Sequence, residues 1–78
     1  MENIELYKQA FIESFEVKEE DLETLEYQDI EMWDSVGHMV LMTALEEKFD
    51  IMMDMDDIIN FSGFEKGKEI LMNYDIKI

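Results

Sequence analysis

The stretch WDSVGHMVLMTALEEKFDI, residues 33–51, decides how this chain folds, because it holds the most regular helical pattern in the sequence. Asp and Ser are both favoured helix N-caps, so a helix is expected to begin at Asp34-Ser35 and to run to about Asp50. At about 100° per residue, two apolar clusters fall on different arcs of this helix. The core arc comprises Leu41, Met42, Leu45 and Phe49, and the opposite arc comprises Val36, Met39 and Val40 with Thr43.

The opposite arc is more apolar surface than a helix needs in order to bury one side. It is short, lies beside Ser35, and gives way to Glu46 and Glu47 toward the C-terminal end. An apolar centre with a charged rim is typical of a docking surface. We therefore expect partner binding at Val36, Met39, Val40, Glu46 and Glu47. The alternative is that a short third or fourth helix covers this arc.

Three further helices are expected before and after this one. Apolar residues at spacings of three and four predict an amphipathic helix over residues 3–15. A short helix is expected near residues 56–61, and a last helix over residues 64–73 in which Gly67 lowers the helix propensity. The run Ser62-Gly63-Phe64-Glu65 fits a capping box at the start of that last helix.

Residues 16–34 lack regular spacing and are expected to form a long loop with one short helical turn. Nine acidic residues and one lysine, Lys18, lie in this segment. Isolated apolar residues should pin it to the core, namely Val17, Leu22, Leu25, Tyr27, Ile30 and Trp33. A loop this long in a small domain is expected to be functional, and here it leads to Ser35. The chain has no proline and no repeat, so one all-α domain is predicted over residues 1–78, a small four-helix bundle with a long loop between helices 1 and 2.

Charge and composition restrict the classes of partner. The chain has 47% hydrophobic residues, which favours a folded domain despite a net charge of −15. With 21 acidic residues against 6 basic ones, nucleic acid and anionic membranes are not expected partners, whereas basic protein surfaces are. The acidic N-terminal residues 1–5 give no secretory signal and no apolar run could span a bilayer, so a cytoplasmic protein is expected.

Two signatures at a defined spacing carry a family resemblance. Asp34-Ser35-Val36 resembles the Asp-Ser-Leu site of acyl and peptidyl carrier proteins. Residues 44–51, Ala-Leu-Glu-Glu-Lys-Phe-Asp-Ile, are similar to the Ala-Leu-Glu-Glu-x-Phe-x-Ile signature of the same family. The fold expected from periodicity also looks like that of these carriers, with three main helices, a short one and a long first loop.

The resemblance implies a carrier and not an enzyme. It implies that Ser35 carries a 4′-phosphopantetheine arm whose thiol holds acyl groups as thioesters, with Asp34 in a supporting role. The implied partners are a phosphopantetheinyl transferase and acyl-loading or acyl-transferring enzymes with basic docking surfaces, and we expect a monomer. A phosphodiester on Ser35 would also lie at a helix N-terminus, where free amides and the helix dipole favour an anion.

Several positions depart from the fatty-acid carriers. Val36 replaces the usual leucine, Gly37-His38 replaces acidic or hydroxylated residues, Val40 replaces a common Glu, and Asp54 lies where proline is frequent. These departures favour a specialised free-standing carrier that serves a dedicated biosynthetic pathway, as some carriers for surface polysaccharides do.

Other functions fit the residues less well. Asp34, Ser35 and His38 are the residue types of a hydrolase triad, but neighbours on one short helix cannot form the relay. An EF-hand starting at Asp54 fails because Ile58 and Ile59 occupy its fifth and sixth positions. Methionines without Cys or His nearby are more often core filling than a soft-metal site, so no metal is expected. An aminoacyl or peptidyl carrier and an unmodified acidic adaptor for a basic partner stay open as alternatives.

Overall fold

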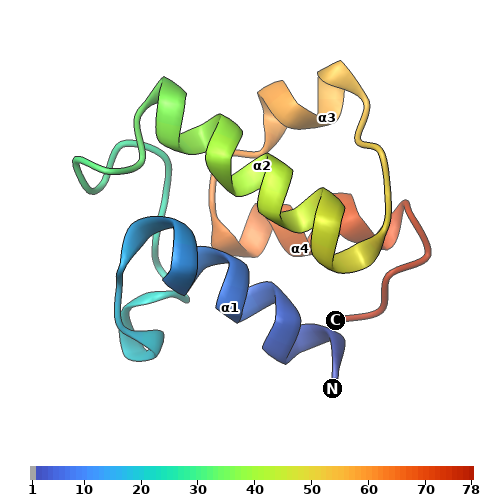
Figure 1. The fold of residues 1–78 in the computed structure, drawn as a ribbon, viewed down its shortest axis with the longest axis horizontal. Helices are drawn as coiled ribbons and strands as arrows, with labels where there is room; N and C mark the ends of the chain where they lie inside the picture. Colours follow the sequence, from blue (N-terminus) through green and yellow to red (C-terminus); the bar gives the residue numbers. More distant parts are fainter. Residues whose placement is uncertain (1) are drawn as a thin grey trace.

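Four α-helices make up the fold of this computed structural model, which describes residues 2–78 (Figure 1). The helices are α1 (Asn3–Phe15), α2 (Ser35–Phe49), α3 (Met55–Asn60) and α4 (Phe64–Met72). One turn of 3-10 helix, η1 (Glu19–Asp21), lies in the long loop. Within residues 2–78 the only β-type pairing is a single bridge between Glu26 and Gly63. The all-α prediction is confirmed, and the predicted helix boundaries agree with the observed ones to within a residue or so.

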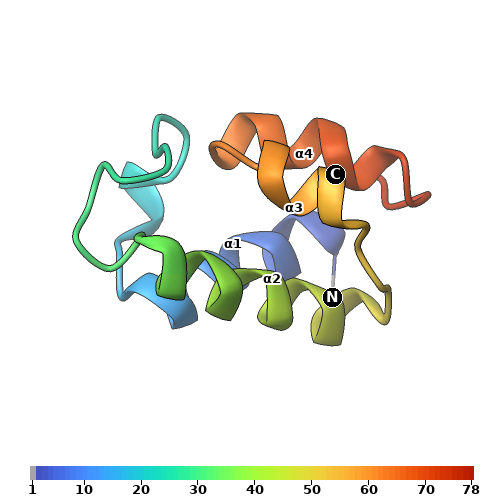
Figure 2. The same cartoon turned by 90° about the horizontal axis from the view of Figure 1, so that it is seen from above.

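The helices surround one core. Helices α1 and α2 run antiparallel and pack directly against each other, and α3 lies on the side of α2 away from α1 (Figures 1 and 2). Helix α4 lies on the far side of the core from α2 (Figure 2). The side-chain Nδ2 of Asn3 donates to the backbone carbonyl of Lys77 at 3.1 Å, which ties the two ends of the described chain together. No helix in the described residues 2–78 has both the length and the apolar character that crossing a membrane requires.

Aromatic rings dominate the core. Phe11 lies at its centre, with ring centroids 5.1 Å from Tyr7, 5.5 Å from Trp33 and 5.1 Å from Phe64. The core arc of α2 is confirmed, because Leu41, Met42 and Leu45 are buried and Phe49 packs partly buried against them. Edge-to-face aromatic pairs add to the burial of their apolar area, which suits a chain too short to bury a large core.

The long loop is anchored to this core by most of the predicted apolar residues, but the prediction is wrong for Tyr27, which is 37% exposed and meets the ring of Trp33 edge-on outside the core cluster. Leu22, Leu25 and Trp33 are buried, whereas the acidic side chains of the loop point to solvent. The loop also pairs with the connection between α3 and α4, because the Tyr27 amide donates to the Ser62 carbonyl at 3.0 Å and the Phe64 amide donates to the Leu25 carbonyl at 2.9 Å. Nineteen residues of irregular chain are therefore held by apolar anchors and backbone hydrogen bonds.

The start of α4 differs from the prediction. The N-cap is Gly63, in an extended conformation and without a side-chain cap, so the capping box predicted from Ser62 to Glu65 is wrong. The reason is tertiary: residues 62–64 are committed to the pairing with the loop. Gly67 also has a packing role, since a Cβ there would overlap the ring of Phe61 and the hydroxyl of Tyr7. Its low helix propensity is the cost of letting α4 approach the aromatic core.

Candidate functional site

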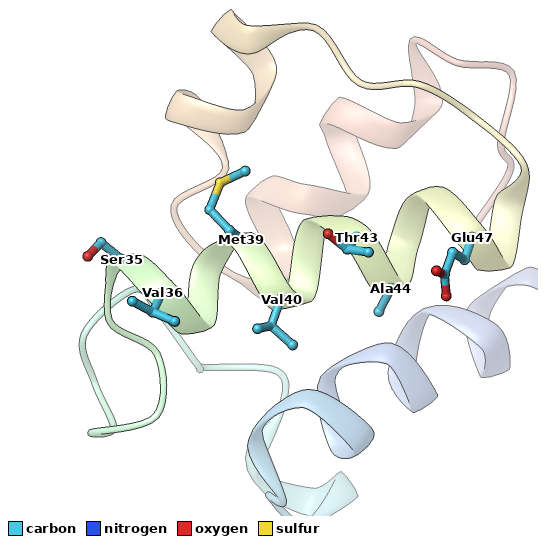
Figure 3. A pocket seen from close by; sticks show the side chains of 7 residues that line it. All are labelled: Ser35, Val36, Met39, Val40, Thr43, Ala44 and Glu47. Atoms are coloured by element: carbon cyan, nitrogen blue, oxygen red, sulfur yellow. The ribbon is translucent and has the colours of Figure 1, made fainter.

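Ser35 begins α2 and is exposed at the surface. Asp34 is the N-cap, and its carboxylate accepts a hydrogen bond from the Gly37 amide at 2.8 Å. The backbone of Asp34 accepts from the His38 amide at 2.8 Å and so closes the first turn. The cap predicted for Asp34 is confirmed, and the Ser35 side chain points away from the helix body (Figure 3).

Gly37 fixes how the long loop joins α2. A Cβ on Gly37 would overlap the carbonyl oxygen of Met32, a backbone atom that cannot move as a flexible side chain can. The same Cβ would lie 3.3 Å from the ring of Phe15. Only glycine therefore allows the loop to pass this close to the first turn, which sets the position of Ser35 two residues earlier.

His38 of α2 is half-buried, and its side chain makes two hydrogen bonds. Its Nδ1 lies 2.9 Å from the indole Nε1 of Trp33, and its Nε2 lies 2.7 Å from the carbonyl oxygen of Ile58 in α3. The imidazole also stacks on Trp33 and meets the rings of Tyr27 and Phe61 edge-on. Sequence spacing alone could not predict the contact with Ile58, because the two residues lie twenty positions apart and meet only through packing of α2 against α3.

These contacts also bear on the hydrolase alternative. The carboxylate of Asp34 is bound to the Gly37 amide, and both ring nitrogens of His38 are engaged by Trp33 and Ile58. Neither group is oriented toward the other as a triad requires. Ser35 thus has no base beside it within its own helix turn.

Two apolar hollows adjoin Ser35. The outer one, of about 630 Å³, is a shallow surface on α2, and the inner one, of about 390 Å³, lies between α2 and α3. The outer hollow is lined by Ser35, Val36, Met39, Val40, Thr43, Ala44 and Glu47 (Figure 3). The inner hollow is lined by Tyr27, Ser35, His38, Met39, Met55, Ile58, Ile59, Phe61 and Ser62. Ser35 and Met39 belong to both, so the serine lies where the two hollows meet.

The structure brings most of the predicted docking residues together. Val36 is 72% exposed, Met39 51% and Val40 50%, so the alternative in which another helix covers them does not apply to the described fold. Glu47 lies at the edge of the same outer hollow. Glu46 is placed differently, because its carboxylate accepts from the Met53 amide at 3.0 Å and anchors the chain after α2.

Most residues of the inner hollow were not predicted to belong to a site, and Tyr27 was expected only as an anchor of the loop. Met55 and Ile59 of α3 are 70% and 71% exposed, and Tyr27 contributes from the long loop. Their signal was weak but present, since Met55 and Ile59 are four residues apart on a helix whose other positions include Asp56 and Asp57. In the described part of the chain, residues 2–78, no cluster of three or more His, Asp or Glu side chains could hold a metal ion.

Comparison of the chain with protein-family models, with curated proteins and with solved structures gave no match in any of the three.

Proposed function

We propose that this chain is an acyl carrier protein that is modified on Ser35 with 4′-phosphopantetheine. The observation that carries the proposal is the place of Ser35, exposed at the start of α2 where an outer and an inner apolar hollow meet. A serine at this point is open to a modifying enzyme, and anything attached to it lies beside apolar surface. The resemblance of residues 34–36 and 44–51 to carrier signatures supports the same function.

The residues around Ser35 fit the chemistry of the group. A phosphodiester on the serine would lie at the N-terminus of a 15-residue helix, where unpaired amides and the dipole favour an anion. The carboxylate of Asp34 is a second negative charge at this helix end, and the hydrogen bond that it accepts from the Gly37 amide partly offsets that charge. The phosphopantetheine group would supply a terminal thiol that holds acyl cargo as a thioester. The inner hollow, at about 390 Å³, is within the size range of small-molecule sites.

Partner enzymes would dock on the outer hollow. Its exposed apolar part is formed by Val36, Met39 and Val40. Glu47 lies at its edge, and the net charge of −15 makes the surrounding protein surface acidic. Such a surface suits a transferase or acyl-transferring enzyme with a basic docking face. The chain would act as a substrate for these enzymes and not as a catalyst.

Intact mass after co-expression with a promiscuous phosphopantetheinyl transferase tests the proposal. Wild type should gain one phosphopantetheine and Ser35→Ala none. Ser62→Ala is the matched control, because Ser62 is also exposed and lines the same inner hollow. An unmodified wild type, or a modified Ser35→Ala variant, would contradict the assignment.

The exposed apolar surface also favours a second candidate, an unmodified acidic adaptor for a basic protein. That candidate predicts that the wild type stays unmodified and binds a basic partner, and that the Val36→Ser or Val40→Ser variant no longer binds this partner. An aminoacyl or peptidyl carrier would share the modification of Ser35, and loading of the thiol by acyl-activating or aminoacyl-activating enzymes would distinguish the two carriers.

A further inference from the structure

Helix α3 forms one wall of the inner hollow, yet its own side chains make few buried contacts that could hold it in place. It has six residues, none of them buried, and helices of this length are not stable by themselves. Ile58 is half-buried against the core, whereas Met55 and Ile59 point to solvent or to the hollow. Something outside α3 must therefore fix its position.

Polar contacts from other elements hold α3 at two places. Near its N-terminus, the Tyr74 hydroxyl accepts from the Asp54 amide at 2.8 Å and donates to the Asp57 carboxylate at 2.6 Å. Near its C-terminus, the carbonyl of Ile58 lies 2.7 Å from His38 Nε2. That carbonyl belongs to the last turn of α3, where carbonyls lack a full intrahelical partner. Among residues 2–78, the only backbone group that donates to it is the Phe61 amide, at a long 3.4 Å.

The tautomer of His38 follows from its partners. An indole N–H can only donate, so Nδ1 of His38 must accept from Trp33. The proton of the neutral ring then lies on Nε2, which donates to the Ile58 carbonyl. His38 thus relays a hydrogen bond from the buried Trp33 through α2 to the end of α3, and its ring is one side of the inner hollow.

We propose that His38 is a positioning residue that caps α3 from α2 and thereby sets the width of the hollow beside Ser35. This proposal rests on the proposed function in one respect: the width of the hollow matters to a carrier only because the hollow adjoins Ser35. The contact itself does not depend on modification of Ser35. Tyr74 holds the other end of α3 but does not line the hollow, so the two clamps can be separated by mutation.

The chain offers direct reporters for this contact, since it contains one His and one Trp. In wild type, nitrogen-15 shifts of the imidazole should show the Nε2–H tautomer, and the indole N–H should be protected from exchange. His38→Leu removes both hydrogen bonds. His38→Gln keeps one acceptor and one donor and is the conservative rescue. Tyr74→Phe is the matched control for a looser α3 with an intact Trp33–His38 bond.

Hydrogen exchange and probe binding give the readouts. In His38→Leu, amides of residues 58–61 should exchange about tenfold faster, while amides in α1 stay within about twofold of wild type. Binding of the neutral dye N-phenyl-1-naphthylamine should weaken by about threefold or more, because one wall of the hollow is no longer fixed. His38→Gln should restore most of both, and Tyr74→Phe should leave the indole signal unchanged.

Several results would overturn the proposal. An Nδ1–H tautomer in wild type would do so without any variant, even if His38→Leu failed to fold. Unchanged exchange and dye binding in His38→Leu would also do so, as would equal, chain-wide loosening in the Leu and Gln variants. Phosphopantetheine attachment, followed by mass in the same variants, tests the proposed function separately, because either result can occur without the other.

Discussion

Replacing Gly37 with Ala sets two opposite effects against each other in the first turn of α2. In an exposed helix the change stabilises by about 1 kcal/mol, because Ala has the higher helix propensity. At Gly37, however, the new Cβ would overlap the carbonyl oxygen of Met32 and press on the ring of Phe15. Crowding of this kind typically costs about 1–3 kcal/mol.

The clash also threatens the helix cap. Moving α2 away from Met32 displaces the Gly37 amide from the carboxylate of Asp34, a cap worth about 1 kcal/mol. Taking about 2 for crowding and about 1 for the cap, less about 1 for propensity, we expect Gly37→Ala to lose about 2 kcal/mol. That is a large share of the stability of a small domain.

Urea unfolding followed by circular dichroism measures this loss, as a fall of about 1–2 M in the midpoint. Thr43→Ala is the control, because it changes an exposed position of the same helix and should shift stability by less than about 0.5 kcal/mol. A Gly37→Ala variant as stable as wild type, or more stable, would refute the close approach of the loop to α2.

Three further predictions concern caps, ionisation and charge. Glu16 ends α1 with φ 56°, so Glu16→Gly should be more stable than Glu16→Ala by about 1 kcal/mol in urea unfolding, whereas equal stabilities would mean that only the lost charge matters. Burial, and then the charge of Glu65, raise the pKa of Tyr7, whose hydroxyl donates to the Phe64 carbonyl at 2.6 Å. Because the raised pKa belongs to the folded state, the free energy of unfolding that Tyr7 contributes should be fully present below about pH 10 and should fall above it. Tyr7→Phe should lower the free energy of unfolding by about 1–3 kcal/mol at pH 7, and this loss should be smaller at pH 11. An equal loss at both pH values would contradict the reasoning. The melting temperature of wild type should rise between about 10 mM and 500 mM NaCl, and a flat response would show that self-repulsion of the net charge of −15 is unimportant.

Local periodicity was sufficient to predict the helices and the faces of α2. The spacing of Leu41 and Leu45 identified the buried side, and Val36 and Val40 the exposed one, because both depend only on rotation about the helix axis. Trp33 was predicted as one of the isolated apolar residues that anchor the acidic loop, and it is fully buried.

Contacts between distant segments were beyond such reasoning. The hydrogen bond from His38 to Ile58 requires α2 and α3 to meet at one relative position, which no local pattern encodes. Helix propensity alone predicts only that Gly67 weakens α4, whereas the structure shows that the ring of Phe61 leaves no room for a larger side chain there. The capping box at Ser62 failed for the same reason, since pairing with the long loop outweighs a local cap.

The exposed arc of α2 and the charge of the chain make sense together. Val36, Met39 and Val40 leave apolar surface open in a domain of only 78 residues, a feature that normally invites self-association. Two copies meeting through this arc would each bring a net charge of −15, and their repulsion acts over about 10 Å at 0.1 M salt. A basic partner meets attraction over the same range. In the proposed function, the acidic surface would therefore select which proteins can reach the apolar arc, and the arc would then supply the contact area that holds the selected protein beside Ser35.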